Sequence, residues 1–271
     1  MRAFWATLTL SLLPVAAHAT TGTVTAPERE LIVRCETWWK TLDVNGEATV
    51  GSVPGGLCIN GYLDAGRDAP ILDALKPSGT APVTIVIRSG GGDALASMNV
   101  AEVLRARPTT LIADTLCASS CADYLIVAAK RRVVLDNTLL LYHGGVTLDL
   151  LNDAASQVAA AAKADPKVDY ALGMEKTRVD INGKIARQEA LLTASGVSPT
   201  LFRWMDLINH MTAAEAESHC RTGTSIIQYP PQVLARFGLT FDVYGAPNSQ
   251  GAVDALLHKL GKTTNVCFWE E

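Results

Sequence analysis

The stretch that decides the fold is VTIVIRSGGGD, residues 83–93. Its first part, Val83 to Ile87, is apolar or β-branched without regular alternation, which is typical of a strand buried on both faces. Three glycines follow directly, and Asp93 is placed to cap a helix whose apolar residues recur at helical spacing from Ala96 to Leu104. A buried strand, a tight turn and a helix in this order predict one unit of a parallel α/β sheet.

Strands and helices alternate on both sides of this unit, and strands joined by helical crossovers form parallel sheets. We therefore predict an α/β fold with a mainly parallel sheet. The expected strands are Leu57–Leu63 (broken by Gly61), Thr110–Ala113, Val133–Leu135 and Leu139–Tyr142, and the expected helices are Pro70–Lys76 and Ala122–Lys130.

The composition changes after this first half, and we divide the chain accordingly. Alanine-rich and then polar helical sequence follows Leu148, Ser198-Pro199 restarts a helix, and Thr212 to Glu215 has the sequence of a capping box. The expected parts are a signal peptide (1–19), an N-terminal segment (20–56), an α/β core (57–147), a helical insertion packed on that core (148–200) and a C-terminal helical part that completes the fold (201–271).

The N-terminus has the pattern of a secretory signal. Arg2 precedes an apolar stretch, and Ala17-His18-Ala19 is a cleavage sequence, so the mature chain is expected to begin near Thr20 in the periplasm or outside the cell. A retained N-terminal anchor is the alternative; no later stretch is long and apolar enough to span a membrane. The net charge of −4, without a long basic run, gives no support for a nucleic-acid partner or an anionic membrane surface.

All six cysteines lie in the expected mature part. An even number in an oxidising compartment favours disulfides over metal ligation, and we expect neither a metal nor a cofactor. Proximity in the sequence suggests three pairs: Cys35 with Cys58, Cys117 with Cys121, and Cys220 with Cys267. Cys117 and Cys121 could instead be two reduced, buried thiols, because residues four apart reach disulfide distance only in some backbone geometries.

Two turns carry residues that could do chemistry, since sites in open parallel sheets form at the carboxyl ends of strands. Gly91 and Gly92 could direct backbone N–H groups at a developing oxyanion, or could simply form a tight turn. Ser119 and Ser120 lie where a strand enters a helix, and a serine hydroxyl needs a base to become a nucleophile. His143, at a strand end and followed by two glycines, is the natural base; the alternative is a structural histidine.

Taken together, residues 85–93, 117–129 and 139–144 resemble the Clp protease proteolytic subunit of the ClpP/crotonase superfamily. They are most similar to its periplasmic relatives with a Cys-x-Ser-x-Cys pattern. The resemblance covers about residues 57 to 145 and depends on the order and spacing of the motifs. It implies a spiral of ββα units and assembly of identical chains into trimers or rings.

The resemblance also implies roles for individual residues. Ser120 matches the nucleophile, with Ser119 as the alternative if the register follows the cysteine pattern, and His143 matches the base. The backbone N–H groups of Gly92 and Cys121, with Gly91 beside them, match the oxyanion hole.

The third member of the triad is less well matched. Asp206 is the nearest candidate, although its spacing to the helix that follows is slightly short. The cysteines around the serine turn also differ from the cytosolic protease. If they are bridged, the turn is rigid, and the direction of its serine is open.

Three functional hypotheses are consistent with these residues. The first is an exported serine hydrolase, a peptidase that acts on peptides or unfolded protein without ATP. The second is a non-catalytic scaffold of the same fold that binds a peptide or partner subunit. The third is crotonase-like chemistry on acyl thioesters, which fits the glycine turn but not export, where coenzyme A is scarce.

Overall fold

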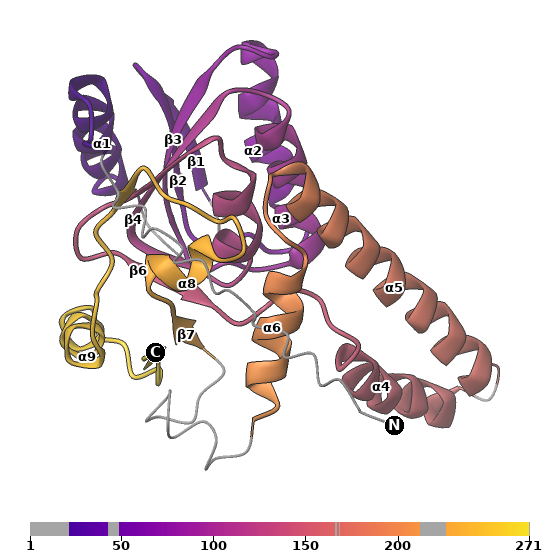
Figure 1. The fold of residues 1–271 in the computed structure, drawn as a ribbon. Helices are drawn as coiled ribbons and strands as arrows, with labels where there is room; N and C mark the ends of the chain where they lie inside the picture. Colours follow the sequence, from indigo (N-terminus) through magenta and orange to yellow (C-terminus); the bar gives the residue numbers. More distant parts are fainter. Residues whose placement is uncertain (1–21, 43–48, 166, 168, 212–225, 271) are drawn as a thin grey trace, which may run out of the picture.

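The computed structural model describes residues 22–42, 49–165, 167, 169–211 and 226–270 (Figure 1). These residues form one sheet of nine strands. Seven follow the order β1-β2-β3-β4-β6-β7-β9; off this path, β5 pairs with β4, and β8 pairs with β5. The pairs β1–β2 and β6–β7 are antiparallel, and the other pairs are parallel. The predicted α/β fold with a mainly parallel sheet is confirmed.

The strands are β1 (Thr49–Val53), β2 (Gly56–Asn60), β3 (Val83–Ser89), β4 (Thr109–Ala118), β5 (Arg131–Val134), β6 (Leu139–Tyr142), β7 (Ile227–Gln228), β8 (Val243–Tyr244) and β9 (Cys267–Phe268). The helices are α1 (Ala26–Trp39), α2 (Asp68–Leu75), α3 (Ala94–Arg105), α4 (Leu150–Ala164), α5 (Tyr170–Ala194), α6 (Thr200–Asn209), α8 (Pro231–Ala235) and α9 (Gln250–Lys259). A 3₁₀ turn, η1 (Lys76–Ser78), and a π-helix, η2 (Cys121–Ile126), complete the described elements.

Helices cover both faces of the sheet, as the buried strand at its centre predicts. Alternate residues of β3 point to opposite sides: Ile85 and Ile87 join the core beneath α2, α3 and η2, whereas Val86 joins the core beneath α1. Asp93 caps α3 as expected, because its carboxylate accepts a hydrogen bond of 2.8 Å from the Ala96 N–H group. Figure 1 shows α1 on one side of the sheet and α2 and α3 on the other.

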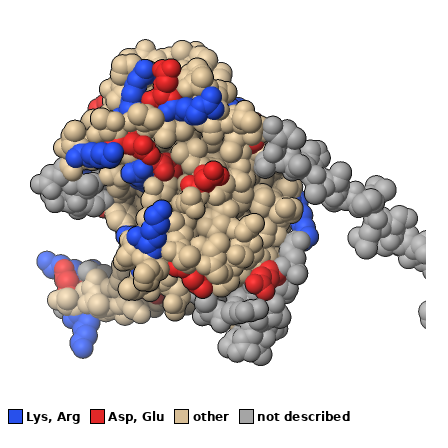
Figure 2. Space-filling model, turned by 90° about the vertical axis from the view of Figure 1, so that its left-hand side faces the viewer, with Lys and Arg blue, Asp and Glu red and all other residues tan. Residues whose placement is uncertain are grey.

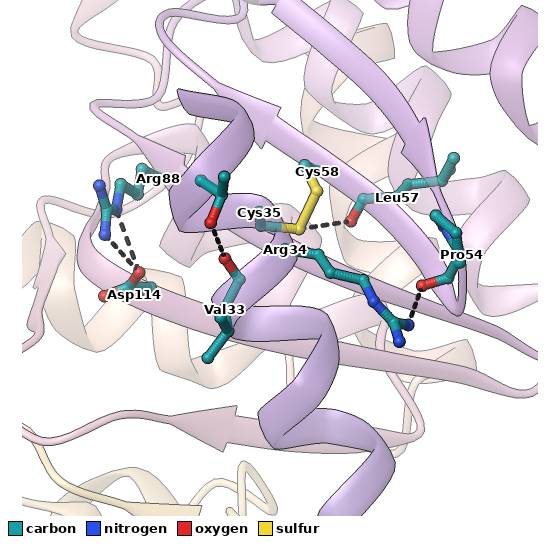
Figure 3. Close-up of a disulfide and its surroundings, with 9 residues drawn as sticks. Val33, Arg34, Cys35, Pro54, Leu57, Cys58, Arg88 and Asp114 are labelled. Carbon is teal, nitrogen blue, oxygen red and sulfur yellow. Dashed lines mark hydrogen bonds and ion pairs between the residues drawn. A yellow bond between two sulfur atoms is a disulfide. The ribbon is translucent and has the colours of Figure 1, made fainter. Parts of the chain in front are cut away.

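The N-terminal segment contains a helix that was not predicted from the sequence. Thr25 and Glu28 form a capping box at the start of α1. The Cys35–Cys58 disulfide then ties α1 to β2, and Figure 3 shows it between the helix and the strand, close to the Leu57 carbonyl. This pair and the Cys117–Cys121 pair are disulfides, as predicted. The third predicted pair includes Cys220, which lies outside the described residues.

The second half of the chain is helical but also contributes strands. α4 and α5 pack as a long hairpin that extends away from the sheet, and no residue of α4 is buried (Figure 1). The C-terminal part, which we expected to be helical, adds the short strands β7, β8 and β9 to the sheet. The predicted capping box at residues 212–215 lies outside the described residues.

Two further observations concern the helices and the surface. None of the described helices combines the length and the apolar character needed to cross a membrane. On the face drawn in Figure 2, basic and acidic side chains are interspersed among uncharged ones.

Candidate active site

Strand pairing brings the serine turn and His143 together. β4 is long enough to pair with two strands in succession, with β5 through Thr110 to Ala113 and with β6 through Leu116 to Ala118. The last pair of the β4–β6 ladder is Ala118 with Leu141, and the Ser119 N–H group donates to the Leu141 carbonyl at 2.9 Å. The chain therefore leaves both strands at the same edge, Ser119 from one and His143 from the other.

Ser119 is the serine that faces the histidine. Its Oγ lies 2.5 Å from Nε2 of His143. Its backbone has a φ of 55°, in the left-handed region that residues other than glycine seldom adopt and that is frequently found at functional sites. The residue expected only as the alternative nucleophile is thus the one in contact with His143.

Ser120 has a different environment. Its side chain is buried, with 4% of its surface exposed, and its Oγ donates a hydrogen bond of 2.8 Å to the Gly92 carbonyl. This bond joins the serine turn to the glycine turn, so the two turns singled out in the sequence form one site. Ser120 holds the site together and does not point at His143.

The glycine turn requires its glycines. A Cβ atom on Gly91 would lie 2.5 Å from the Ala118 carbonyl oxygen and 2.6 Å from Cβ of Ser119. Gly92 has a φ of 143°, and a Cβ there would lie 2.5 Å from the backbone of Leu63. The N–H group of Gly91 donates to Oγ of Ser89 at 3.1 Å, whereas that of Gly92 has no hydrogen-bond partner among the described residues.

These contacts leave two N–H groups suited to an oxyanion. One belongs to Gly92. The other belongs to Ser120, which follows Ser119 at the start of a helix, where the first N–H groups lack intrahelical acceptors. Cys121, which we expected to supply this group, is one residue further along the helix.

The environment of His143 favours its neutral form. Although 45% of the side chain is exposed, the packed groups around the ring desolvate it and lower its pKa below the ordinary value of 6.5. A neutral imidazole can accept a proton from a serine hydroxyl at neutral pH, whereas an imidazolium cannot.

Asp123 is a residue near the site that was not predicted from the sequence. It lies in η2, four residues after Ser119, and its N–H group donates to the Ser119 carbonyl at 2.8 Å. Its side chain is 1% exposed, and Oδ2 lies 4.0 Å from Nε2 of His143. Oδ1 is buried without a hydrogen-bond partner, and burial raises the pKa of this carboxyl well above its usual range.

Asp206 faces a different histidine. It lies on α6, where its carboxylate is 3.9 Å from His210, and no ion pair among the described residues joins that carboxylate to His143. Together with Asp149 and His210, it forms a group of possible metal ligands, not fully buried, whose ligand atoms lie within 4.8 Å of one another. Nothing else at this group indicates a bound ion.

A largely apolar pocket opens beside Ser119 and has a volume of about 220 Å³. Strands β4 and β6 supply one wall, through Leu116, Leu139 and Leu141. The C-terminal part also lines the pocket, through residues of α9 and the segment after it. The other lining residues are Tyr62, Gly90, Ala118, Ser119, His143, Ile226, Leu257, Leu260, Lys262, Thr264 and Val266.

Comparisons with known proteins add a structural likeness. No protein family and no curated protein matches the chain. Among solved structures, the chain is similar to the N165D mutant of ClpP1 from Listeria monocytogenes, with a TM-score of 0.36 and 16% identity over 72% of this chain and 92% of that one. It is also similar to the catalytic domain of the ClpP protease from Plasmodium falciparum, with a TM-score of 0.35 and 11% identity over 70% of this chain and 83% of that one. Likeness at these scores says nothing about activity, so the function has to be inferred from the geometry of the site.

Proposed function

We propose that this protein is a serine hydrolase that cleaves peptides or unfolded protein segments, with Ser119 as the nucleophile and His143 as the base. The observation that carries the proposal is the 2.5 Å contact between Oγ of Ser119 and Nε2 of His143, at the ends of neighbouring strands. A nucleophile within hydrogen-bond reach of a neutral base is the arrangement that acyl transfer requires.

The reaction follows from these positions. Oγ of Ser119 attacks the carbonyl carbon while its proton passes to Nε2 of His143, and the carbonyl oxygen becomes an anion. The N–H groups of Gly92 and Ser120 stabilise that anion. The imidazolium then returns the proton to the leaving amine as the carbon–nitrogen bond breaks, and water, deprotonated by His143, releases the acid from Ser119.

The pocket suggests which substrates fit. It begins at Ser119 and is walled mainly by leucine, isoleucine and valine side chains, which exclude water and favour an apolar group. A volume of about 220 Å³ accommodates one side chain of moderate size and not an extended ligand. We therefore expect cleavage after apolar residues in short or flexible chains.

The experiment is active-site labelling with a fluorophosphonate probe, followed by mass spectrometry of the modified peptide. We expect modification of Ser119, and its loss in Ser119→Ala and in His143→Ala. Ser156→Ala is the matched control, because it removes an exposed hydroxyl on α4 and leaves both turns intact. Ser120→Ala keeps the proposed nucleophile but removes the hydrogen bond to the Gly92 carbonyl, so we expect Ser119 to be labelled more slowly in that variant.

The outcomes separate the hypotheses. Labelling of Ser120 that survives in Ser119→Ala would reverse the assignment of the nucleophile. A correctly folded protein that takes no label at any serine would contradict the hydrolase proposal and favour the non-catalytic, peptide-binding scaffold. Assembly of identical chains into trimers or rings stays a prediction, which sedimentation velocity measures directly.

Location is a separate part of the proposal. Buried disulfides such as the two described here are typical of proteins that fold in an oxidising compartment. We propose that the protein is exported to such a compartment, the periplasm or the outside of the cell. The N-terminal signal would be cleaved near Ala19. N-terminal sequencing of the protein recovered from its native host tests the cleavage position.

A further inference from the structure

Ser119 occupies a backbone conformation that its own side chain does not favour. Its φ of 55° lies in the left-handed region, where the Cβ of an L-residue crowds the following carbonyl oxygen. Aspartate and asparagine tolerate this region better than serine does. The surroundings of Ser119 must therefore hold it there, and with it the direction of Oγ toward His143.

The Cys117–Cys121 disulfide lies directly across this residue. Cys117 belongs to the end of β4, where it pairs with Ser89 on one side and Leu140 on the other, so its position is fixed by the sheet. Cys121 begins η2. The bond brings their Cα atoms to 5.3 Å and closes a small ring that contains Ala118, Ser119 and Ser120.

Both half-cystines are inaccessible. Cys117 and Cys121 are each 0% exposed, within the main core of the protein. A regulatory disulfide has to be reached by a reductant, and exposed or strained bonds are the ones that are readily reduced. This bond is therefore suited to a fixed structural task and not to reversible switching.

The second disulfide provides the contrast. Cys35 and Cys58 have the same Cα separation of 5.3 Å and are equally buried, but they join segments 23 residues apart, against 4 for Cys117 and Cys121. A disulfide that closes a longer loop restricts the unfolded chain more. The short ring around Ser119 contributes less stability by this mechanism. Its main effect is therefore on the local geometry of the turn.

We propose that the Cys117–Cys121 disulfide is a positioning device for catalysis: it holds Ser119 in the left-handed conformation that directs Oγ at His143 and Ser120 N–H at the oxyanion. The proposal rests on the hydrolase function proposed above. Without the bond, the turn relaxes toward ordinary helical or extended conformations, and the hydroxyl leaves the base. The two cysteines act through Ser119 and touch neither substrate nor the reacting atoms.

The test compares two double variants of the full mature chain. Cys117→Ala/Cys121→Ala removes the proposed positioning bond. Cys35→Ala/Cys58→Ala is the control, because it removes a disulfide with the same Cα separation at another place in the protein. Since a displacement of about 1 Å in a reacting group lowers turnover by about 100-fold, we expect a fall of that order in kcat for the first variant, with KM little changed. The control variant is expected to keep its kcat and lose thermal stability.

A spectroscopic readout makes the test independent of turnover. The ring nitrogen and Cε1–H resonances of His143 report its hydrogen bond to Ser119. We expect them to shift in Cys117→Ala/Cys121→Ala toward those of Ser119→Ala, and to stay unchanged in Cys35→Ala/Cys58→Ala. If wild-type protein neither turns over substrate nor takes a fluorophosphonate label, the hydrolase function fails, while these resonances still decide whether the disulfide positions Ser119.

Partial reduction of the wild-type protein covers the case in which a variant does not fold. Because both bonds are buried, aliquots are treated with a phosphine in urea below the unfolding transition, alkylated, returned to buffer without urea, and assayed for labelling rate and for the bond that has opened. Loss of rate that follows opening of Cys117–Cys121 supports the proposal. Equal kcat in both variants with unchanged His143 resonances, or loss of rate that follows Cys35–Cys58 instead, would overturn it.

Discussion

His143 determines how the proposed activity depends on pH, because it must be neutral to accept the Ser119 proton. Desolvation lowers its pKa below 6.5, so the ring stays neutral over more of the acidic range than an exposed histidine does. We expect the fluorophosphonate labelling rate to fall on acidification with a midpoint below pH 6.5. Circular dichroism at each pH controls for unfolding, and a midpoint near neutrality in folded protein would contradict the prediction.

Gly91 lies so close to the serine turn that the site has no room for a side chain at this position. In Gly91→Ala the added methyl group would meet the Ala118 carbonyl and Cβ of Ser119, so the serine turn has to move. We expect the labelling rate to fall by about 100-fold, the effect of a shift of about 1 Å at a reacting group.

Gly183→Ala is the matched control for Gly91→Ala. A Cβ at Gly183 meets nothing within 4 Å, and the residue lies inside α5. The exchange is therefore expected to stabilise the protein by about 0.5–1 kcal/mol, the ordinary difference in helix propensity, without changing the labelling rate. Equal rates in Gly91→Ala and Gly183→Ala would show that the glycine turn does not fix the serine.

For single residues, the sequence predicts which ones lie together, but not which of the two serines contacts His143. The order of strand ends was sufficient to bring the glycine turn, the serine turn and His143 together. The choice between Ser119 and Ser120 depends on a single left-handed φ, and a serine gives no sign of such a conformation in the sequence. Asp123 could have been noticed as an acid within the otherwise apolar stretch after Cys121.

Among the elements, α1 is attached to the sheet by one disulfide as well as by apolar packing. The Cys35–Cys58 disulfide closes a loop of 23 residues, for which loop entropy predicts a contribution of about 3 kcal/mol to the free energy of unfolding. We expect Cys35→Ala/Cys58→Ala to lose about this amount in urea unfolding, and Cys117→Ala/Cys121→Ala to lose about 2 kcal/mol by the same reasoning. A larger loss in Cys117→Ala/Cys121→Ala than in Cys35→Ala/Cys58→Ala would show that loop length does not determine how much each disulfide stabilises the protein.

Helices and strands were predicted correctly where the residues of the segment alone indicate the element. The β-branched run of β3 and the cap at Asp93 are local, and both elements form where the sequence places them. β7, β8 and β9 are two residues long, too short for any periodicity, and exist because neighbouring strands offer free edges. The capping box of α1 is present in the sequence at Thr25 and Glu28, and Leu31, Cys35 and Trp39 follow at helical spacing, so this helix could have been predicted from the sequence.

For the whole molecule, the buried carboxyl of Asp123 predicts a stability that depends on pH. Its pKa is raised in the folded protein by burial next to His143, Tyr142 and Tyr229, while in the unfolded chain it returns toward 3.8. The contribution of this group is therefore complete below the unfolded pKa and is lost as the pH rises toward the folded pKa.

Asp123→Asn keeps the shape of the neutral acid and removes its titration. We expect the free energy of unfolding of the variant, relative to wild type, to increase as the pH rises from the unfolded value of 3.8 toward the raised pKa of the folded state. Urea unfolding across this range measures the difference. Asp180→Asn is the control, because Asp180 is exposed in an i,i+4 pair with Lys184 and its loss changes stability little. A constant difference between Asp123→Asn and wild type would mean that Asp123 does not keep its proton in the folded state.

The pocket beside Ser119 joins two parts of the chain that lie far apart in the sequence. The proposed nucleophile and base lie in the middle of the sequence, whereas other lining residues, from Leu257 to Val266, lie near the end. A cut in the chain before Leu257 would therefore remove residues that line the pocket and leave Ser119 and His143 in the remaining part. Substitutions between Leu257 and Val266 would likewise change the shape of the pocket without replacing Ser119 or His143.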